Sequence, residues 1–89
     1  QKFEKAYGQT RMLAEKAPDN LAYQSLHANA TSGIGDYPKA IELYNEVLKK
    51  SPRQVMLYVM RGHAEKTSGE LDDAITSYRK AISCNLTSS

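Results

Sequence analysis

Apolar residues recur along this chain at the spacing of an α-helix. In the last third of the sequence they stand at positions i, i+3, i+4, i+7, i+10 and i+11, namely Leu71, Ala74, Ile75, Tyr78, Ala81 and Ile82. Side chains at these intervals share one face of a helix with about 3.6 residues per turn. Residues 55–68 form another such stretch, and Gly69 separates the two. The pattern therefore predicts two consecutive helices joined by a short turn.

Glycine and proline divide the rest of the chain in the same way. Pro18 and Pro52 end the helices before them, since proline cannot continue a helix. The stretch Gly33–Gly35 breaks a further helical segment. Asp36 then stands where it can cap the next helix, and Pro38 lies in the first turn of that helix. These signals predict five helices and no strand, with helices near residues 3–16, 21–33, 37–49, 55–68 and 71–84.

The sequence also matches itself at an offset of 34 residues. The identical pairs include Pro18 with Pro52, Ala30 with Ala64, Gly35 with Gly69, Ala40 with Ala74, Ile41 with Ile75 and Tyr44 with Tyr78. Most of these are small, aromatic or turn-forming residues rather than common surface types. A fixed period in this range is typical of supersecondary units that stack on one another. We interpret the chain as two copies of a helix pair, preceded by one unpaired helix.

The second copy resembles a known signature. The run Tyr58-x-x-x-Gly62-x-x-x-x-x-x-Gly69-x-x-x-x-Ala74-x-x-x-Tyr78-x-x-Ala81 is similar to that of the tetratricopeptide-repeat (TPR) family, with Tyr58 in place of its usual tryptophan. The first copy matches more loosely, because Gln24 and Thr31 stand where aromatic residues are usual. The second copy has Leu86 where the family has a closing proline.

The resemblance implies an all-α fold, a TPR helix-turn-helix solenoid of about five antiparallel helices. It implies a single array over residues 1–89. This array consists of the second helix of a truncated repeat (1–20) and two full repeats (21–54 and 55–88). In such helix pairs, small residues allow the helices to approach closely, and Ala28, Gly62, Ala40 and Ala74 suit that role. Tyr44 and Tyr78 are expected to bury their rings between helices, with each hydroxyl reaching a polar edge.

Composition offers little for catalysis. The net charge of +2 is spread along the chain without a basic block, which argues against nucleic-acid binding, and no apolar run could span a membrane. One cysteine, Cys84, cannot form an internal disulfide, and the two histidines lack further ligands at zinc-site spacing. The carboxylates are expected to be scattered and solvated, namely Glu15, Glu42, Glu46, Glu65 and Glu70. We therefore expect no enzyme activity, metal or cofactor.

The chain begins with Gln1 inside helical sequence and shows no signal-peptide pattern. These features suggest an excised fragment, and they favour a cytoplasmic location. The expected partners are proteins or peptides rather than nucleic acids or membranes.

TPR arrays bind peptides or partner helices in a concave groove lined by the first helix of each repeat. The residues that match those groove positions are Ala22, Ser25, Leu26, Asn29, Met56, Val59, Met60 and His63, and Lys66 extends the second stripe by one turn. One TPR subclass captures a terminal carboxylate with lysine, arginine and asparagine. Here Ser25 replaces the expected lysine, and Leu26 and Met60 occupy a further asparagine position, although Asn29 matches. The resemblance therefore favours a partly apolar groove over a carboxylate clamp.

Several alternatives remain open. The apolar groove positions could instead pack against a neighbouring helix. A short run, Gly62-His63-Ala64-x-Lys66-Thr67-x-Gly69, is similar to repeats of bacterial proteins with a sulfotransferase domain after their TPRs, which would make this chain the non-catalytic arm of a larger enzyme. A third alternative is structural self-association. The terminal helices carry apolar residues without capping partners, among them Phe3, Ala6, Tyr7, Leu13, Leu71, Ile75, Ile82 and Cys84.

Overall fold

The computed structural model describes residues 2–87, and helices account for nearly all of them. The five helices are α1 (Lys2–Lys16), α2 (Leu21–Gly33), α3 (Tyr37–Lys50), α4 (Val55–Thr67) and α5 (Leu71–Thr87). All five predicted helices are confirmed, and the described residues contain no strand. The largest difference is at α5, which extends to Thr87 rather than ending at residue 84. A leucine at position 86 can continue the helix where the proline of the repeat signature would have ended it.

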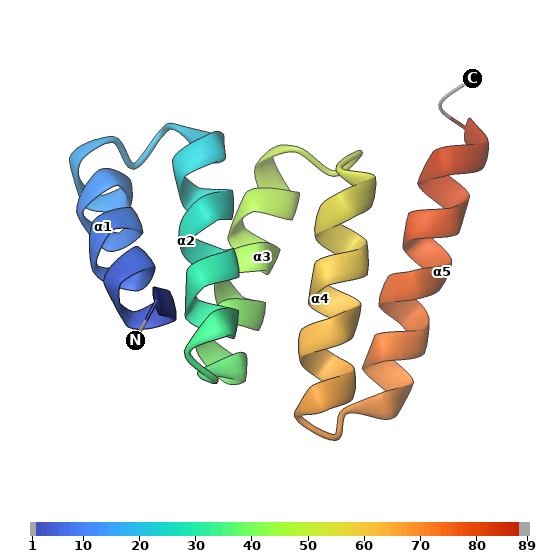
Figure 1. Cartoon of the computed structure of the whole chain (residues 1–89). Helices are drawn as coiled ribbons and strands as arrows, with labels where there is room; N and C mark the ends of the chain where they lie inside the picture. Colours follow the sequence, from blue (N-terminus) through green and yellow to red (C-terminus); the bar gives the residue numbers. More distant parts are fainter. Residues whose placement is uncertain (1, 88–89) are drawn as a thin grey trace.

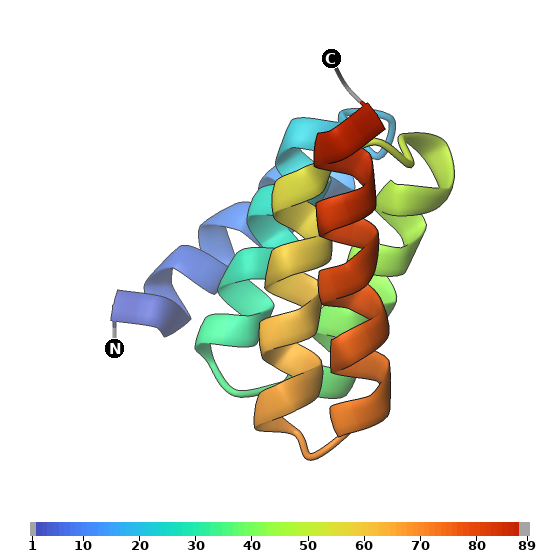
Figure 2. The ribbon, with the colours of Figure 1, turned by 90° about the vertical axis from the view of Figure 1, so that its right-hand side faces the viewer.

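The helices alternate in direction and stack side by side along one axis (Figure 1). Each helix contacts the next one in the chain, and α2 also contacts α4. The first helices of the two repeats, α2 and α4, therefore run parallel to each other, and α3 and α5 return in the opposite direction. Figure 2 shows α2 and α4 on one side of the stack and α3 on the other. The result is a short solenoid with principal extents of 35 × 28 × 17 Å.

The turn within each repeat has the same hydrogen bonds in both copies. Gly35 and Gly69 have φ angles of 90° and 92°, a left-handed conformation that glycine adopts without steric cost. After α2, the N–H of Gly35 donates to Ser32 and the N–H of Asp36 donates to Thr31. The corresponding bonds after α4 join Gly69 to Lys66 and Glu70 to Glu65. Both turns are therefore Schellman motifs, in which paired bonds satisfy the last carbonyl groups of the helix.

Small residues and tyrosines form the core, as the repeat pattern predicts. Ala28 and Ala40 are fully buried where α2 meets α3, and Tyr44 is 1% exposed beside them. In the second repeat Ala74 and Ala81 are buried on α5, and the ring of Tyr78 lies directly against Gly62. The missing side chain at position 62 thus makes room for the tyrosine.

The structure corrects two expectations about single residues. Asp36 is the N-cap residue of α3, but its side chain makes no capping hydrogen bond; Asn20 does make one at the start of α2. Glu65 is buried rather than solvated, because it accepts a hydrogen bond from the buried hydroxyl of Ser77. Cys84 on α5 is half-buried and packs against the core, in keeping with a small apolar residue.

The apolar stripe on α5 divides between two faces. Ala74 and Ala81 are buried toward the rest of the molecule. Leu71, Ile75 and Ile82 point outward and are 58%, 50% and 61% exposed. At the other end of the molecule, Ala6 and Tyr7 are half-buried and Leu13 is partly exposed. Phe3 lies outside the part of the chain whose side chains the structure describes.

Candidate functional site

The predicted groove positions lie on the two parallel helices α2 and α4. Ala22, Leu26, Met56, His63 and Lys66 are exposed there, and the remaining four, Ser25, Asn29, Val59 and Met60, are half-buried. We call the surface formed by these nine residues the A face. Because α2 and α4 contact each other and run in the same direction, their equivalent positions lie at similar heights along it.

One end of the A face is apolar. Leu26 on α2 is 49% exposed and Met56 on α4 is 65% exposed, so both present apolar surface to solvent. Val59 and Met60 lie beneath this surface and pack against the core. They therefore support the face more than they form its outer layer. Methionine suits such a position because its unbranched, polarisable side chain adapts to differently shaped partners.

The other end of the A face is polar, and a tyrosine from the second helix of each repeat holds it in place. The hydroxyl of Tyr44 donates to Oδ1 of Asn29 at 2.7 Å. The hydroxyl of Tyr78 lies 3.0 Å from Nδ1 of His63, and the two rings meet edge to face. Asn29 and His63 occupy the same position of the 34-residue repeat, as do the two tyrosines. In each repeat a tyrosine of the second helix therefore contacts a polar side chain of the first helix, Asn29 in one copy and His63 in the other.

Burial keeps the hydroxyl group of Tyr44 protonated. Burial raises the pKa of Tyr44 to about 12, so its hydroxyl remains a hydrogen-bond donor at physiological pH. An amide oxygen that accepts this bond leaves the Asn29 NH₂ group directed away from the tyrosine, where it can donate to a partner. Lys66 adds a positive charge one turn beyond His63, so this end of the face suits an acidic group.

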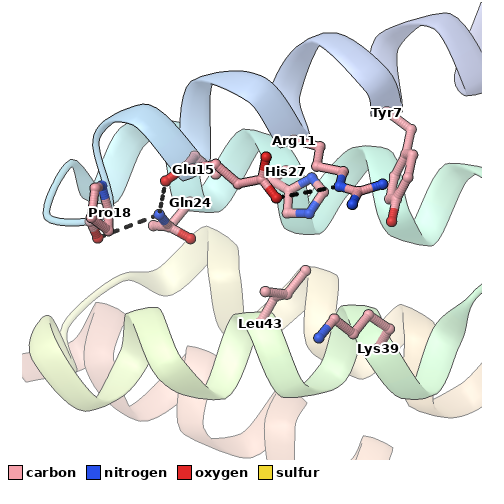
Figure 3. Close-up of a pocket in the computed structure, with 9 residues that line it drawn as sticks. Tyr7, Arg11, Glu15, Pro18, Gln24, His27, Lys39 and Leu43 are labelled. Atoms are coloured by element: carbon pink, nitrogen blue, oxygen red, sulfur yellow. Dashed lines mark hydrogen bonds and ion pairs between the residues drawn. The ribbon is translucent and has the colours of Figure 1, made fainter.

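Two hollows lie on the opposite side of α2 and α4, between successive second helices. The first notch, between α1, α2 and α3, encloses about 560 Å³ and is lined by residues that include Arg11, Glu15, His27 and Lys39 (Figure 3). The second notch, between α3, α4 and α5, encloses about 530 Å³ and is lined by residues that include Asn45, Lys49, Arg61 and Lys80. Arg61 stands one repeat after His27, so the two hollows are equivalent positions in the solenoid.

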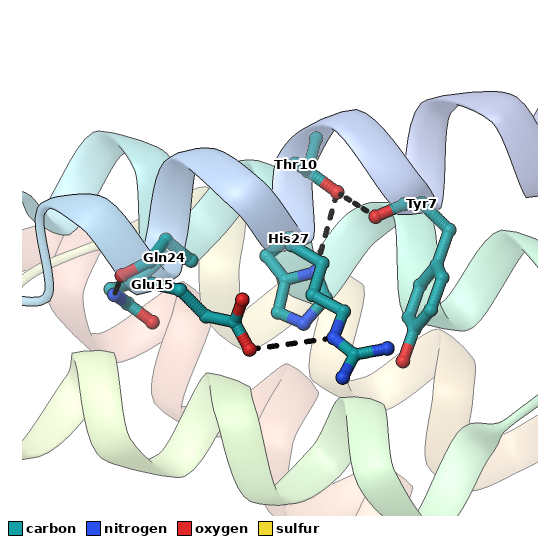
Figure 4. A network of polar contacts seen from close by, with 7 residues as sticks. Tyr7, Thr10, Glu15, Gln24 and His27 are labelled. Atoms are coloured by element: carbon teal, nitrogen blue, oxygen red, sulfur yellow. Dashed lines mark hydrogen bonds and ion pairs between the residues drawn. The ribbon is translucent and has the colours of Figure 1, made fainter.

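A buried histidine forms the floor of the first notch (Figure 4). His27 is 7% exposed, and its Nδ1 lies 3.3 Å from the hydroxyl oxygen of Thr10. That hydroxyl also lies 3.1 Å from the carbonyl oxygen of Tyr7, and when it donates there, Nδ1–H of the imidazole donates to the hydroxyl oxygen. Burial lowers the pKa of His27, and the nearby charges of Lys39 and Arg11 lower it further, against the opposing effect of Glu15.

A polar chain links three helices at the second notch. Nη1 of Arg61 donates to Asn45 on α3 at 2.8 Å, and its Nε donates to Ser77 on α5 at 2.9 Å. The guanidinium also lies over the ring of Tyr58, 5.1 Å from its centre, and the Ser77 hydroxyl in turn bonds Glu65. Periodicity within single helices cannot reveal the hydrogen bonds of Arg61 and Ser77, because these bonds join residues 12 or 16 positions apart on different helices. The one sequence feature that points to these contacts is Arg61 itself, a polar residue on an otherwise apolar face of its helix.

Among the described residues, no group of three or more histidine, cysteine, aspartate or glutamate side chains could hold a metal ion. No helix in the described part of the chain is long and apolar enough to cross a membrane.

Comparisons with known proteins agree with this architecture. Residues 57–86 match the family model described as tetratricopeptide repeat. The chain is similar to a solved structure titled "MamA MSR-1 C2", with a TM-score of 0.91 and 19% sequence identity. The match covers 99% of this chain and 51% of the other, so this chain spans about half the length of that structure. At this identity the likeness establishes the fold alone. No curated protein matches the sequence.

Proposed function

Since residues 57–86 belong to the tetratricopeptide-repeat family and the chain as a whole has the fold of a TPR solenoid, we propose that it is a protein-interaction scaffold that binds a peptide or partner helix on the A face. The TPR fold is in general a non-catalytic scaffold, and we infer that this chain carries out no chemistry of its own. As the arm of a larger enzyme it would serve the same purpose, which is to hold a partner.

The observation that carries this proposal is the exposure of Leu26 and Met56 on adjacent helices. Neighbouring exposed apolar side chains rimmed by polar groups are typical of interaction sites. Asn29, His63 and Lys66 lie toward the C-terminal ends of α2 and α4 and provide the polar rim. A fitting partner would therefore present apolar side chains to Leu26 and Met56 and an acidic group to His63 and Lys66.

The test is a selection of displayed peptides against the purified chain, followed by affinity measurements on variants. Leu26→Glu combined with Met56→Glu places two charges in the apolar end without disturbing a buried residue. We expect the selected peptides to bind this variant at least about tenfold more weakly, since apolar contacts near the centre of an interface carry much of its energy. Peptides that bind through the A face should also share apolar positions at helical spacing.

Met12→Glu is the matched control, because Met12 is an equally exposed apolar residue on α1, away from the A face. It should change affinity by less than about twofold, as expected for a residue outside the interface. Selected peptides that bind the Leu26 and Met56 variant as well as the parent chain would place the binding site elsewhere and overturn the proposal.

A second candidate function is self-association, and the open face of α5 favours it. Leu71, Ile75 and Ile82 correspond to Tyr37, Ile41 and Leu48 on α3, one repeat earlier. On α3 Leu48 is buried and Tyr37 and Ile41 are half-buried against the core, whereas the residues on α5 are exposed. The same kind of surface that α4 covers on α3 is thus available on α5 to a second copy.

A further inference from the structure

We propose that the first notch binds a doubly charged tetrahedral oxyanion of the phosphate-monoester type. This site lies apart from the A face. On α2 its residues Gln24 and His27 are offset by about 100–200° around the helix axis from Ser25 and Leu26, because successive residues turn by about 100°. Binding at the two surfaces can therefore be tested independently.

Cationic groups converge on this hollow from separate helices. Figure 3 shows Arg11 on α1, His27 on α2 and Lys39 on α3 turned toward the same space. Lys39 makes no hydrogen bond or ion pair within the described part of the chain. Arg11 has a long contact of 3.4 Å with Glu15, and both side chains are largely exposed, so this ion pair contributes little to stability. Two cations against one carboxylate leave an excess of one positive charge.

His27 can add a second positive charge on binding. Its Nδ1 lies beside the Thr10 hydroxyl, and in the protonated ring both Nδ1 and Nε2 carry a hydrogen. The imidazolium would then donate from Nε2 to an oxyanion while Nδ1 keeps its existing bond. The titratable groups that face this ring are Tyr7, Arg11 and Glu15 from α1 and Lys39 from α3. An arriving dianion would offset the repulsion that the two cations exert on the ring.

The second notch shows what distinguishes the first. There the cation at the His27 position, Arg61, is already bonded to Asn45 and Ser77 and lies over Tyr58. The net charge of the two notches is the same, because Glu42 and Glu46 face Lys49, Lys80 and Arg61 in the second notch, so the difference lies in how the cations are bonded. The equivalent guanidinium is thus already hydrogen-bonded within the protein, whereas at the first notch Lys39 is exposed without such bonds and Arg11 has only its long contact with Glu15. A phosphate group offers several acceptor oxygens and a double charge, which match a guanidinium, an ammonium and an imidazolium.

The test follows the ring signals of His27 by NMR in the 89-residue chain, with sulfate as a probe that does not titrate near neutral pH. Sodium chloride and acetate at matched ionic strength are the reference. We expect saturable shifts with sulfate and an increase of about one unit in the pKa of His27, equivalent to about tenfold tighter binding by the protonated form. Affinity should therefore rise as the pH falls. The His63→Gln variant removes one of the two sets of histidine ring signals, so the remaining set is assigned to His27.

Lys39→Met should weaken sulfate binding about tenfold, as expected for loss of one charge-assisted contact. Lys80→Met is the matched control, because it removes the same charge from the second notch and should leave affinity within about twofold. Three further ligands distinguish the source of the oxyanion. They are a peptide carrying phosphoserine, the same peptide without its phosphate group, and inorganic phosphate. Tighter binding of the phosphopeptide than of phosphate identifies a phosphorylated chain, and equal binding identifies a free oxyanion. The proposal is overturned if sulfate and chloride have the same effect on His27, or if the two lysine variants bind sulfate equally.

Discussion

At residue 62 the absence of a side chain decides how closely α4 and α5 approach. A methyl group added at Gly62 would lie 2.8 Å from Cε1 of Tyr78 and 3.0 Å from two further ring atoms. The first repeat has Ala28 at this position, fully buried beside Tyr44. The two repeats therefore share a sequence pattern but differ in how near the tyrosine ring sits to the first helix.

Gly62→Ala tests this close approach. Alanine gains about 1 kcal/mol over glycine in a helix interior, but overpacking against a ring typically costs about 1–3 kcal/mol. We expect the variant to be less stable than the parent chain by about 1 kcal/mol in urea unfolding. Gly8→Ala is the control, because nothing lies within 4 Å of the added group, and it should stabilise α1 by about 0.5–1 kcal/mol. An increase in stability from both substitutions would show that the Tyr78 ring moves aside freely.

Single-residue environments were the least predictable part of this molecule. The sequence indicates that Tyr44 and Tyr78 are buried, since they recur at the repeat spacing. It does not indicate that Glu65 is buried, because a glutamate on a helix is most often solvated. The hydrogen-bond partner that makes its burial tolerable, Ser77, comes from another helix and occupies a position where the first repeat has Leu43. Contacts that differ between the copies cannot be read from what the copies share.

Helices, in contrast, follow closely from local signals. Their starts and ends are fixed by proline, by glycine with positive φ and by capping residues, all of which act within about one turn. Only the end of α5 departs by several residues, and there the usual stop signal is missing. The start of α3 shows the limit of the same reasoning. Asp36 has a suitable residue type, but its φ and ψ of −87° and 71° do not bring the carboxylate to a free N–H group.

Two substitutions compare a cap that is formed with one that is not. Asn20 accepts a hydrogen bond from the N–H of Tyr23 at 3.1 Å, so Asn20→Ala should destabilise the chain by about 1 kcal/mol. Asp36→Ala should cost at most a few tenths of a kcal/mol, because only its favourable charge near the helix N-terminus is lost. Thermal unfolding monitored by circular dichroism gives both values. Equal losses would mean that the Asp36 carboxylate caps α3 in solution after all.

The whole molecule brings together features that lie far apart in the sequence. The residues of the A face were predicted from the groove positions of the TPR family, and their binding role stays a prediction. The first notch could not be predicted in this way, since Arg11, His27 and Lys39 belong to three helices and follow no common motif. What makes it distinctive is a difference between repeats: Arg61 at the second notch is hydrogen-bonded to neighbouring side chains, whereas Arg11 and Lys39 at the first notch are exposed.

At this scale the open face of α5 leads to the last prediction. Leu71, Ile75 and Ile82 are exposed, whereas their counterparts on α3 are buried or half-buried against the core. We expect the chain to associate weakly and reversibly through this face, since three residues bury far less than the roughly 800 Å² per partner of a stable interface. In sedimentation velocity the parent chain should therefore rise above its monomer mass of 9.9 kDa as concentration increases.

Ile75→Glu combined with Ile82→Lys should keep the chain monomeric over the same concentrations without lowering its unfolding temperature, because both side chains are already exposed. Met56→Glu introduces a charge of the same kind on the A face and should leave the association intact. If Met56→Glu abolishes it instead, the second copy docks on the A face, and the apolar end of that face serves self-association rather than a separate partner. If the parent chain and both variants are all monomeric over the whole concentration series, the exposed face of α5 does not drive association.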